Sequence, residues 1–283
     1  MTTEIDQLLA SKPLITSQTK KNYVNIYKKI HGILQQTISE TDDEQILFVL
    51  DEISNSNVNN ELTYINVVIL IRQALNQKCT LLEKRRDYLK TLRDKETKKP
   101  KEIDLPPYND VKAYIEELFQ KGDYKRYIVN FLIFNYGVRN KDVNVLITTR
   151  KDVKNIDTNT NYLLVKQREI EWIRNEYKTV ASHLQQRIVI KAKNFITAVK
   201  ALELNTWLLS GTATPISETS VTNIITRMLF KHNGENLSES DYFKLNIKHL
   251  QTQPNSYSKI ALLSAYRGTA METIEKYYNL LKQ

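Results

Sequence analysis

The sequence predicts a mainly helical protein with a small antiparallel β-sheet, an α+β fold. Apolar residues recur at helical spacing along most of the chain, for example through residues 19–34. Short strand-like stretches interrupt this pattern only in the second half, at residues 162–165, 169–177 and 187–191. Strands that follow one another so closely favour antiparallel pairing in a meander.

The segment at residues 94–107 separates two regions of the chain. It is charged and contains three prolines, which prevent a helix from continuing. We therefore expect two domains, a helical one at residues 1–103 and a mixed one at residues 104–283.

The first domain is expected to consist of helices. The segment from Ser17 to Thr19 can cap the first of them, and helices are predicted at residues 19–34, 43–54, 62–75 and 81–93. Several basic side chains lie off the apolar faces of these helices, where they can follow a DNA backbone. The candidates for this contact are Lys20, Lys21, Lys28, Arg85, Arg86 and Lys90.

In the second domain, helices surround the predicted strands. They are expected at residues 108–120, 124–136, 141–146, 194–204, 219–230, 242–250, 256–266 and 270–281. Gly122 and Gly268 break this pattern, and residues 207–209 are apolar enough for a short extended piece.

Composition narrows the class of protein. Hydrophobic residues make up 41% and charged residues 26%, as in soluble globular proteins. We expect no membrane span, no signal peptide and an intracellular location. Cys79 is the single cysteine, so an internal disulfide is impossible and a reducing compartment fits. The four histidines offer no zinc spacing and no glycine-rich phosphate loop is present, so we expect neither a metal nor a cofactor.

The charge of the chain is unevenly distributed. The formal net charge is +9 with a pI of about 9.3, and residues 105–283 carry +8 of it. A basic chain of this size is typical of proteins that bind a polyanion. A polyanion is therefore the expected partner, and cations on helix faces can follow the backbone of double-stranded DNA.

Residues 131–142 contain the most informative stretch, in which an apolar run leads directly to Arg139. An ordinary buried helix with a solvated arginine would give the same pattern. The alternative is an arginine on a rigid support that binds a phosphate. Metal-free DNA strand transfer needs fixed cations at the phosphate, a hydroxyl nucleophile and a cationic general acid. Arg139, Lys178, a later cation and a late tyrosine match that requirement.

Taken together, these residues resemble the tyrosine recombinases of the lambda-integrase type. Residues 134–139 (FNYGVR) are similar to the family box that supplies the first catalytic arginine, and Asp142 occupies the acidic position after it. Further boxes are similar at residues 17–23, 177–190, 207–217 and 264–278. The resemblance implies a helical core-binding domain followed by a catalytic domain, with Lys178 as the general acid and a tyrosine near the C-terminus as the nucleophile.

The chain departs from the family pattern in two places. The H-x-x-R box is absent, and Lys244 with Asp241 falls at about its distance from the tyrosine, with His249 as an alternative contributor. Arg267 stands where the last box has its second histidine, and would supply a phosphate contact instead.

The nucleophile is open between Tyr277 and Tyr278. Tyr277 fits the family spacing better, and the two side chains point roughly 100° apart on a helix, so only one can face the phosphate.

The resemblance implies site-specific DNA recombination or integration through a 3′-phosphotyrosyl intermediate. It also implies that protomers assemble on DNA, and the composition suggests a virus or a mobile element. Two alternatives remain open. One is a DNA-binding architectural protein on the same fold with an impaired site. The other is a type IB-like topoisomerase, which shares the chemistry but exchanges no strands between duplexes.

Overall fold

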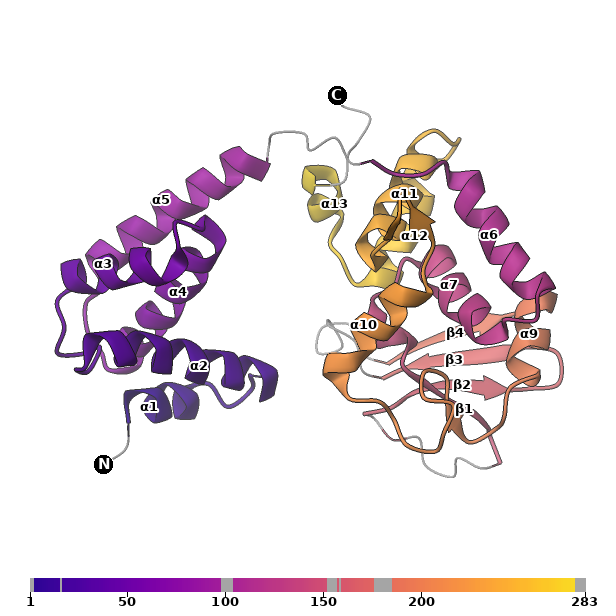
Figure 1. Cartoon of the computed structure of the whole chain (residues 1–283), viewed down its shortest axis with the longest axis horizontal. Coiled ribbons are helices and arrows are strands. Elements are labelled where there is room, and N and C mark those ends of the chain that lie inside the picture. Colours follow the sequence, from indigo (N-terminus) through magenta and orange to yellow (C-terminus); the bar gives the residue numbers. More distant parts are fainter. Residues whose placement is uncertain are drawn as a thin grey trace. The chain divides into compact units, whose positions relative to one another are not determined.

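The computed structural model describes residues 3–15, 17–97, 104–151, 157, 159–175 and 185–277. The chain divides into two compact units, Met1–Lys101 and Glu102–Gln283. In the described residues, the first unit is helical and the second combines helices with strands (Figure 1). The predicted α+β class is therefore confirmed.

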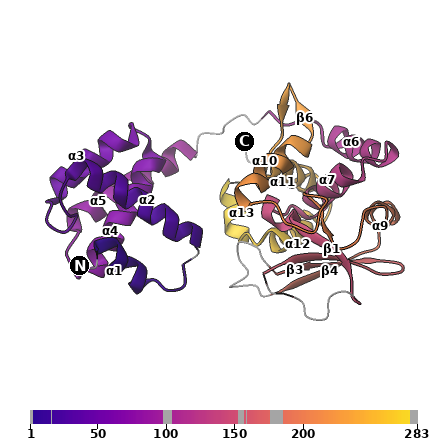
Figure 2. The ribbon, with the colours of Figure 1, turned by 60° about the horizontal axis from the view of Figure 1, so that its bottom comes forward.

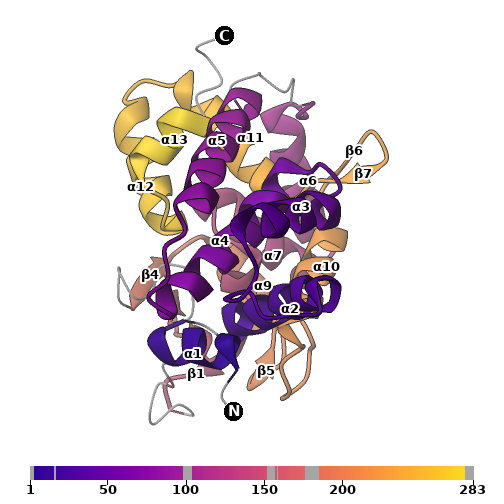
Figure 3. The ribbon, with the colours of Figure 1, turned by 90° about the vertical axis from the view of Figure 1, so that its left-hand side faces the viewer.

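The first unit is a bundle of helices in which α5 packs along α4 (Figure 3). Polar side chains cap the N-terminal ends of several helices. For example, Asp42 accepts a hydrogen bond from the Gln45 N–H, and Asn57 accepts from the N–H groups of residues 59 and 60. The described helices are α1 (Glu4–Ser11), α2 (Ser17–Leu34), α3 (Asp43–Ser54), α4 (Val58–Ala74) and α5 (Thr80–Thr97).

Helix α4 lies at the centre of this bundle. It is apolar on almost every side, and its Ile65, Val68 and Ile71 are fully buried. Leu82 and Leu89 of α5 pack against the same core. Burial of these apolar side chains, more than intrinsic helix propensity, stabilises α4 and α5.

The second unit contains helices and two β-sheets. Its helices are α6 (Tyr108–Gln120), α7 (Tyr124–Tyr136), the 3₁₀ helix η1 (Asn140–Val143), α9 (Lys193–Lys200), α10 (Glu218–Met228), α11 (Glu239–Gln251), α12 (Ser256–Arg267) and α13 (Met271–Tyr277). Its strands are β1 (Val145–Thr149), β2 (Asn161–Val165), β3 (Ile170–Arg174), β4 (Gln186–Ile190), β5 (Thr206–Trp207), β6 (Lys231–His232) and β7 (Glu235–Asn236).

The larger sheet has the strand order β4-β3-β2-β1-β5. Its β2, β3 and β4 form the predicted antiparallel meander, in which Trp172 lies opposite both Leu163 and Ile188. Strand β1 pairs with β2 in parallel, so the sheet is mixed. Strand β5 completes the other edge, and it shares Trp207 with the extended piece expected at residues 207–209.

One part of this sheet was predicted incorrectly. A helix was expected over residues 141–146, but η1 ends at Val143 and the chain enters β1 at Val145. The sequence VLITT in β1 is rich in β-branched residues, which favour a pleated, half-buried surface. Pairing with β2 stabilises the strand, and a short local pattern did not reveal that partner.

Helices α7, α11 and α12 lie on one side of the larger sheet (Figures 1 and 2). The fully buried rings of Trp172, Phe195 and Tyr242 lie in the core between the sheet and the helices. A smaller cluster joins α11, α12 and α13 through Phe243, Leu263 and other apolar side chains. The buried apolar side chains of α7 therefore belong to the larger cluster, and those of α12 belong to the smaller one.

None of the helices in the described part of the chain combines the length and the apolar character needed to cross a bilayer.

Candidate functional site

Arg139 follows the C-terminal end of α7, where the backbone turns sharply. Gly137 ends the helix in the left-handed conformation with a φ of 59°, and its N–H donates to the Ile133 carbonyl at 2.9 Å. A Cβ atom at Gly137 would lie 2.8 Å from a side-chain carbon of Phe243 and 2.9 Å from one of Leu263. Glycine therefore allows the end of α7 to approach α11 and α12 closely.

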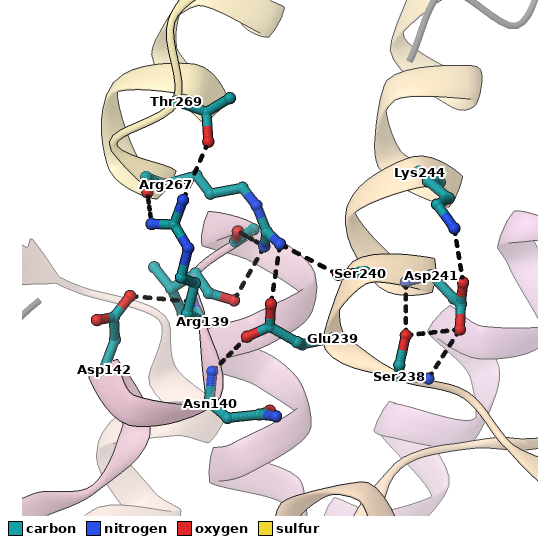
Figure 4. A network of polar contacts seen from close by, with 12 residues as sticks. Arg139, Asn140, Asp142, Ser238, Glu239, Ser240, Asp241, Lys244, Arg267 and Thr269 are labelled. Carbon is teal, nitrogen blue, oxygen red and sulfur yellow. Dashed lines mark hydrogen bonds and ion pairs between the residues drawn. The ribbon is translucent and has the colours of Figure 1, made fainter. Parts of the chain in front are cut away.

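The Arg139 side chain points toward the connection between α12 and α13 (Figure 4). Its Nη1 donates to the Arg267 carbonyl, and its Nη2 lies 3.4 Å from the Thr269 hydroxyl. Burial, together with the nearby charge of Arg267, lowers the pKa of Arg139. The guanidinium is thus partly desolvated and held against the C-terminal end of α12, where free carbonyls favour a cation.

Arg267 is the last residue of α12 and is only 4% exposed. Its Nη1 donates to the Gly137 carbonyl at 2.8 Å, and its Nη2 donates to Glu239 Oε1 at 2.9 Å. The guanidinium also lies 4.4 Å from the centre of the Phe243 ring, a cation–π distance. Arg267 is therefore engaged with its own protein on several sides.

Glu239, in the first turn of α11, is the carboxylate at the centre of this network. One oxygen accepts from Arg267 and the other accepts from the Asn140 N–H (Figure 4). Sequence reasoning did not identify Glu239. The only local signal was its place next to Ser238, which caps α11 in a capping box with Asp241.

Asp142 is fully buried beside Arg139. Its Oδ2 accepts from the Arg139 backbone N–H at 2.9 Å and from Arg174 Nη2 at 2.6 Å. Burial raises the pKa of Asp142, and the charge of Arg174 acts in the opposite direction. Asp142 therefore fixes the backbone of Arg139, while its charge is paired with Arg174. Sequence reasoning missed Arg174, because the end of a strand gives no sign of an internal charge.

The predicted substitutes for the H-x-x-R box lie on α11, away from Arg139 and Arg267. Lys244 Nζ is 3.2 Å from Asp241 Oδ1, and this pair lies apart from Arg139 and Arg267 in Figure 4. The His249 ring stacks on Tyr108, with 3.7 Å between ring centroids. The structure thus brings together Arg139, Asp142 and Arg267, and it does not bring Lys244 or His249 to them.

The remaining predicted catalytic residues lie outside what the structure describes. These are Lys178, Tyr278 and the side chain of Tyr277, although Tyr277 is the last residue of α13. That helix is anchored by Ile274, which is 2% exposed and packs in the cluster with Phe243 and Leu263. Helix α13 starts two residues after Thr269, the residue that Arg139 approaches.

The candidate DNA-binding cations of the first unit differ in their surroundings. Lys21 and Lys28 are exposed on α2, and Lys20 is half-buried there. Arg85 makes two contacts to the buried Glu61, Nε to Oε1 at 2.7 Å and Nη2 to Oε2 at 3.0 Å. Arg86 and Lys90 each lie 3.1 Å from Asp87. The lysines of α2 are therefore better placed for an external anion than Arg85 of α5.

Among the residues that the structure describes, no group of three or more histidine, cysteine, aspartate or glutamate side chains is placed to hold a metal ion.

Comparison with known proteins gives only distant structural likeness. No protein-family model matches the sequence, and no curated protein matches it. The crystal structure of XerA recombinase is similar over 98% of this chain and 93% of that chain, with 13% sequence identity and a TM-score of 0.38. At that TM-score, the likeness carries no weight for function.

Proposed function

We propose that this chain binds double-stranded DNA and breaks and rejoins it as a tyrosine-recombinase-type strand transferase. The main support is the contact between Arg139 and the Arg267 carbonyl, which joins residues 128 positions apart. These residues belong to the first and last catalytic boxes of the resemblance. A catalytic centre of this kind needs the two boxes side by side, next to the helix that carries the tyrosine.

In this proposal Arg139 binds the scissile phosphate. Its guanidinium keeps its contact with the Arg267 carbonyl and donates its remaining N–H groups to phosphate oxygens, where a fixed cation stabilises the charge of the transition state. A tyrosine hydroxyl gives its proton to solvent, and its oxygen forms the bond to phosphorus as the bond to the 5′ oxygen breaks. Lys178 gives its proton to that leaving oxygen. Attack by a 5′-hydroxyl on the phosphotyrosyl bond reverses these steps and restores the tyrosine.

A second candidate is a DNA-binding protein that does not cleave. The observation that favours it is the engagement of Arg267 by Glu239 and the Gly137 carbonyl. A phosphate brought to Arg267 would have to displace a carboxylate of its own sign. Lys244 is likewise paired with Asp241, so the phosphate would have fewer cations than the resemblance implies.

Covalent trapping distinguishes the two candidates. The full-length chain is incubated with supercoiled plasmid and with nicked suicide duplexes, and protein–DNA adducts are separated under denaturing conditions. We expect an adduct from the wild type that is lost in either Tyr277→Phe or Tyr278→Phe. Tyr257→Phe is the matched control, because Tyr257 is an exposed tyrosine of α12, 66% accessible.

The other outcomes of the trapping experiment favour the alternative functions. Salt-sensitive DNA binding without any adduct favours the non-cleaving candidate. Plasmid relaxation without joined products favours a topoisomerase.

Strand exchange also requires several protomers on one DNA, and mass photometry of the DNA complex measures their number. Because the proposed substrate is DNA, the proposed location is intracellular, in the cytoplasm or nucleus of the host.

A further inference from the structure

Arg174, at the end of β3, is a fully buried charged residue in the second unit, with 0% exposure. Its Nη2 lies 2.6 Å from Asp142 Oδ2. Its Nη1 donates to the Tyr266 carbonyl at 2.5 Å and to Gln186 Oε1 at 2.6 Å. A buried guanidinium is costly unless it is paired and hydrogen-bonded, and these contacts meet that condition.

Arg174 joins elements that are far apart in the sequence. Through Asp142 it holds η1, through Tyr266 it holds the last turn of α12, and through Gln186 it holds the start of β4. Gln186 strengthens the same junction, because its Nε2 donates to the Ala265 carbonyl at 3.2 Å. The planar guanidinium fork can serve these acceptors in fixed directions, which a lysine ammonium cannot reproduce.

One group that Arg174 holds also binds Arg139, and another lies next to a group that binds Arg139. Asp142 Oδ2 accepts from Arg174 and from the Arg139 backbone N–H, so one oxygen serves both residues. The Tyr266 carbonyl bound by Arg174 directly precedes the Arg267 carbonyl bound by Arg139. Both the backbone and the guanidinium of Arg139 are therefore located by atoms whose positions Arg174 fixes.

A purely stabilising role would not require this arrangement. A well-packed apolar side chain at a buried site is often as stable as an ion pair. What an apolar side chain cannot do is set the direction of Asp142 and of the α12 carbonyls. Because phosphate contacts depend on preorganised donors, such directional control has a functional use at Arg139.

We propose that Arg174 is a positioning residue that holds Arg139 in register for a DNA phosphate. This inference rests on the proposed function, in which Arg139 contacts DNA. Arg174 itself touches no DNA, and it acts through Asp142 and the end of α12.

The test compares the salt dependence of DNA binding in the wild type, Arg139→Ala, Arg174→Lys and the double variant. Loss of one phosphate contact reduces the slope of log K against log salt by about 0.9. We expect this reduction in Arg139→Ala and in Arg174→Lys, and no further reduction in the double variant. Asp142→Asn, which removes the charge but keeps an acceptor, is the milder second variant if Arg174→Lys does not fold.

The matched control is Arg72→Lys in the first unit. Arg72 is also buried, 8% exposed, with Nη2 3.6 Å from Asp43 Oδ1 and a hydrogen bond to the Thr41 carbonyl. We expect this control to lose thermal stability while its salt slope stays unchanged. All slopes are measured below the melting temperature of each variant, so that a loss of stability alone does not change them.

The outcomes separate the two hypotheses. A slope that falls in Arg139→Ala but not in Arg174→Lys or Asp142→Asn overturns the positioning role and leaves the proposed function intact. A slope that Arg139→Ala does not change overturns the phosphate contact and the positioning role together. A further fall in the double variant means that Arg174 acts independently of Arg139, which also contradicts this inference.

Discussion

Arg267 and Glu239 form a nearly buried ion pair, with 2.9 Å between Nη2 and Oε1 and with side chains 5% and 15% exposed. The pair joins the end of α12 to the start of α11. It also fixes the residue whose carbonyl receives Arg139. Arg267 therefore supports the candidate site from within.

Removing this arginine is expected to destabilise the fold. Arg267→Met leaves Glu239 buried without its partner, so we expect the free energy of unfolding to fall by about 3–5 kcal/mol. Urea denaturation measures this loss. The double variant Arg267→Met with Glu239→Leu removes both charges and is expected to recover part of it. Full stability in Arg267→Met would contradict the structural role and favour an exposed phosphate contact.

Arg139 is expected to contribute to DNA affinity. Arg139→Ala should weaken binding about equally for all DNA sequences and reduce the salt slope by about 0.9, because a phosphate contact carries no base information. Fluorescence anisotropy over a range of salt concentrations measures both effects. Arg126→Ala is the control, since Arg126 pairs with Asp123 and donates to the Tyr114 hydroxyl. An equal reduction in both variants would indicate only a change in net charge.

Gly137 is expected to be intolerant of a side chain. Alanine in the left-handed conformation costs about 1 kcal/mol, and at Gly137 its Cβ would also meet Phe243 and Leu263 at 2.8 and 2.9 Å. Gly122→Ala is a matched control, because Gly122 has a φ of 72° and no atom within 4 Å of the added carbon. We expect Gly137→Ala to lower the free energy of unfolding more than the control does. Equal losses would mean that the end of α7 can move away from α11 and α12.

Asp241 is expected to make stability depend on acidic pH. Burial alone would raise its pKa, but hydrogen bonds from Ser238 and the charge of Lys244 bring the pKa below its ordinary value of 3.8. Because the folded-state pKa is the lower one, this stabilisation is fully present above the ordinary value of 3.8 and is lost as the pH falls below it through the folded-state pKa. We expect Asp241→Asn to cost about 1 kcal/mol near neutral pH and progressively less in acid. Denaturation curves at several pH values test this, and a difference that stays constant down to pH 2 would contradict it.

The basic residues of the first unit are expected to form two groups, one that contacts DNA and one that stabilises the fold. Replacing the exposed Lys21 and Lys28 by alanine should reduce the salt slope of DNA binding by up to about 1.8, the value for two phosphate contacts. Arg85→Ala should mainly reduce stability, because it leaves the buried Glu61 without its partner. Binding titrations and thermal melts of the same variants separate these effects. A larger loss of DNA affinity in Arg85→Ala than in the lysine variant would reverse the assignment.

Local sequence signals predicted most of the helices and the antiparallel meander. Apolar residues at helical spacing predicted α2 and α7, and the β-rich stretches predicted β2, β3 and β4. Helix α7 also ends at Tyr136, the bound predicted for it. These signals act over a few residues, which is why the sequence alone was sufficient. Strand β1 was missed because it pairs with β2 in parallel, without the tight hairpin turn that would mark such a pairing in the sequence.

The surroundings of Arg139 were decided by the tertiary structure alone. The sequence singled out Arg139, Asp142 and Arg267. It offered no sign that Glu239 would pair with Arg267 or that Arg174 would pair with Asp142. Whether a charged side chain binds its own protein or an external anion depends on burial and on contacts between distant segments. A one-dimensional pattern contains neither, so only the fold could show that Arg267 lies inside the network and that Arg174 completes it.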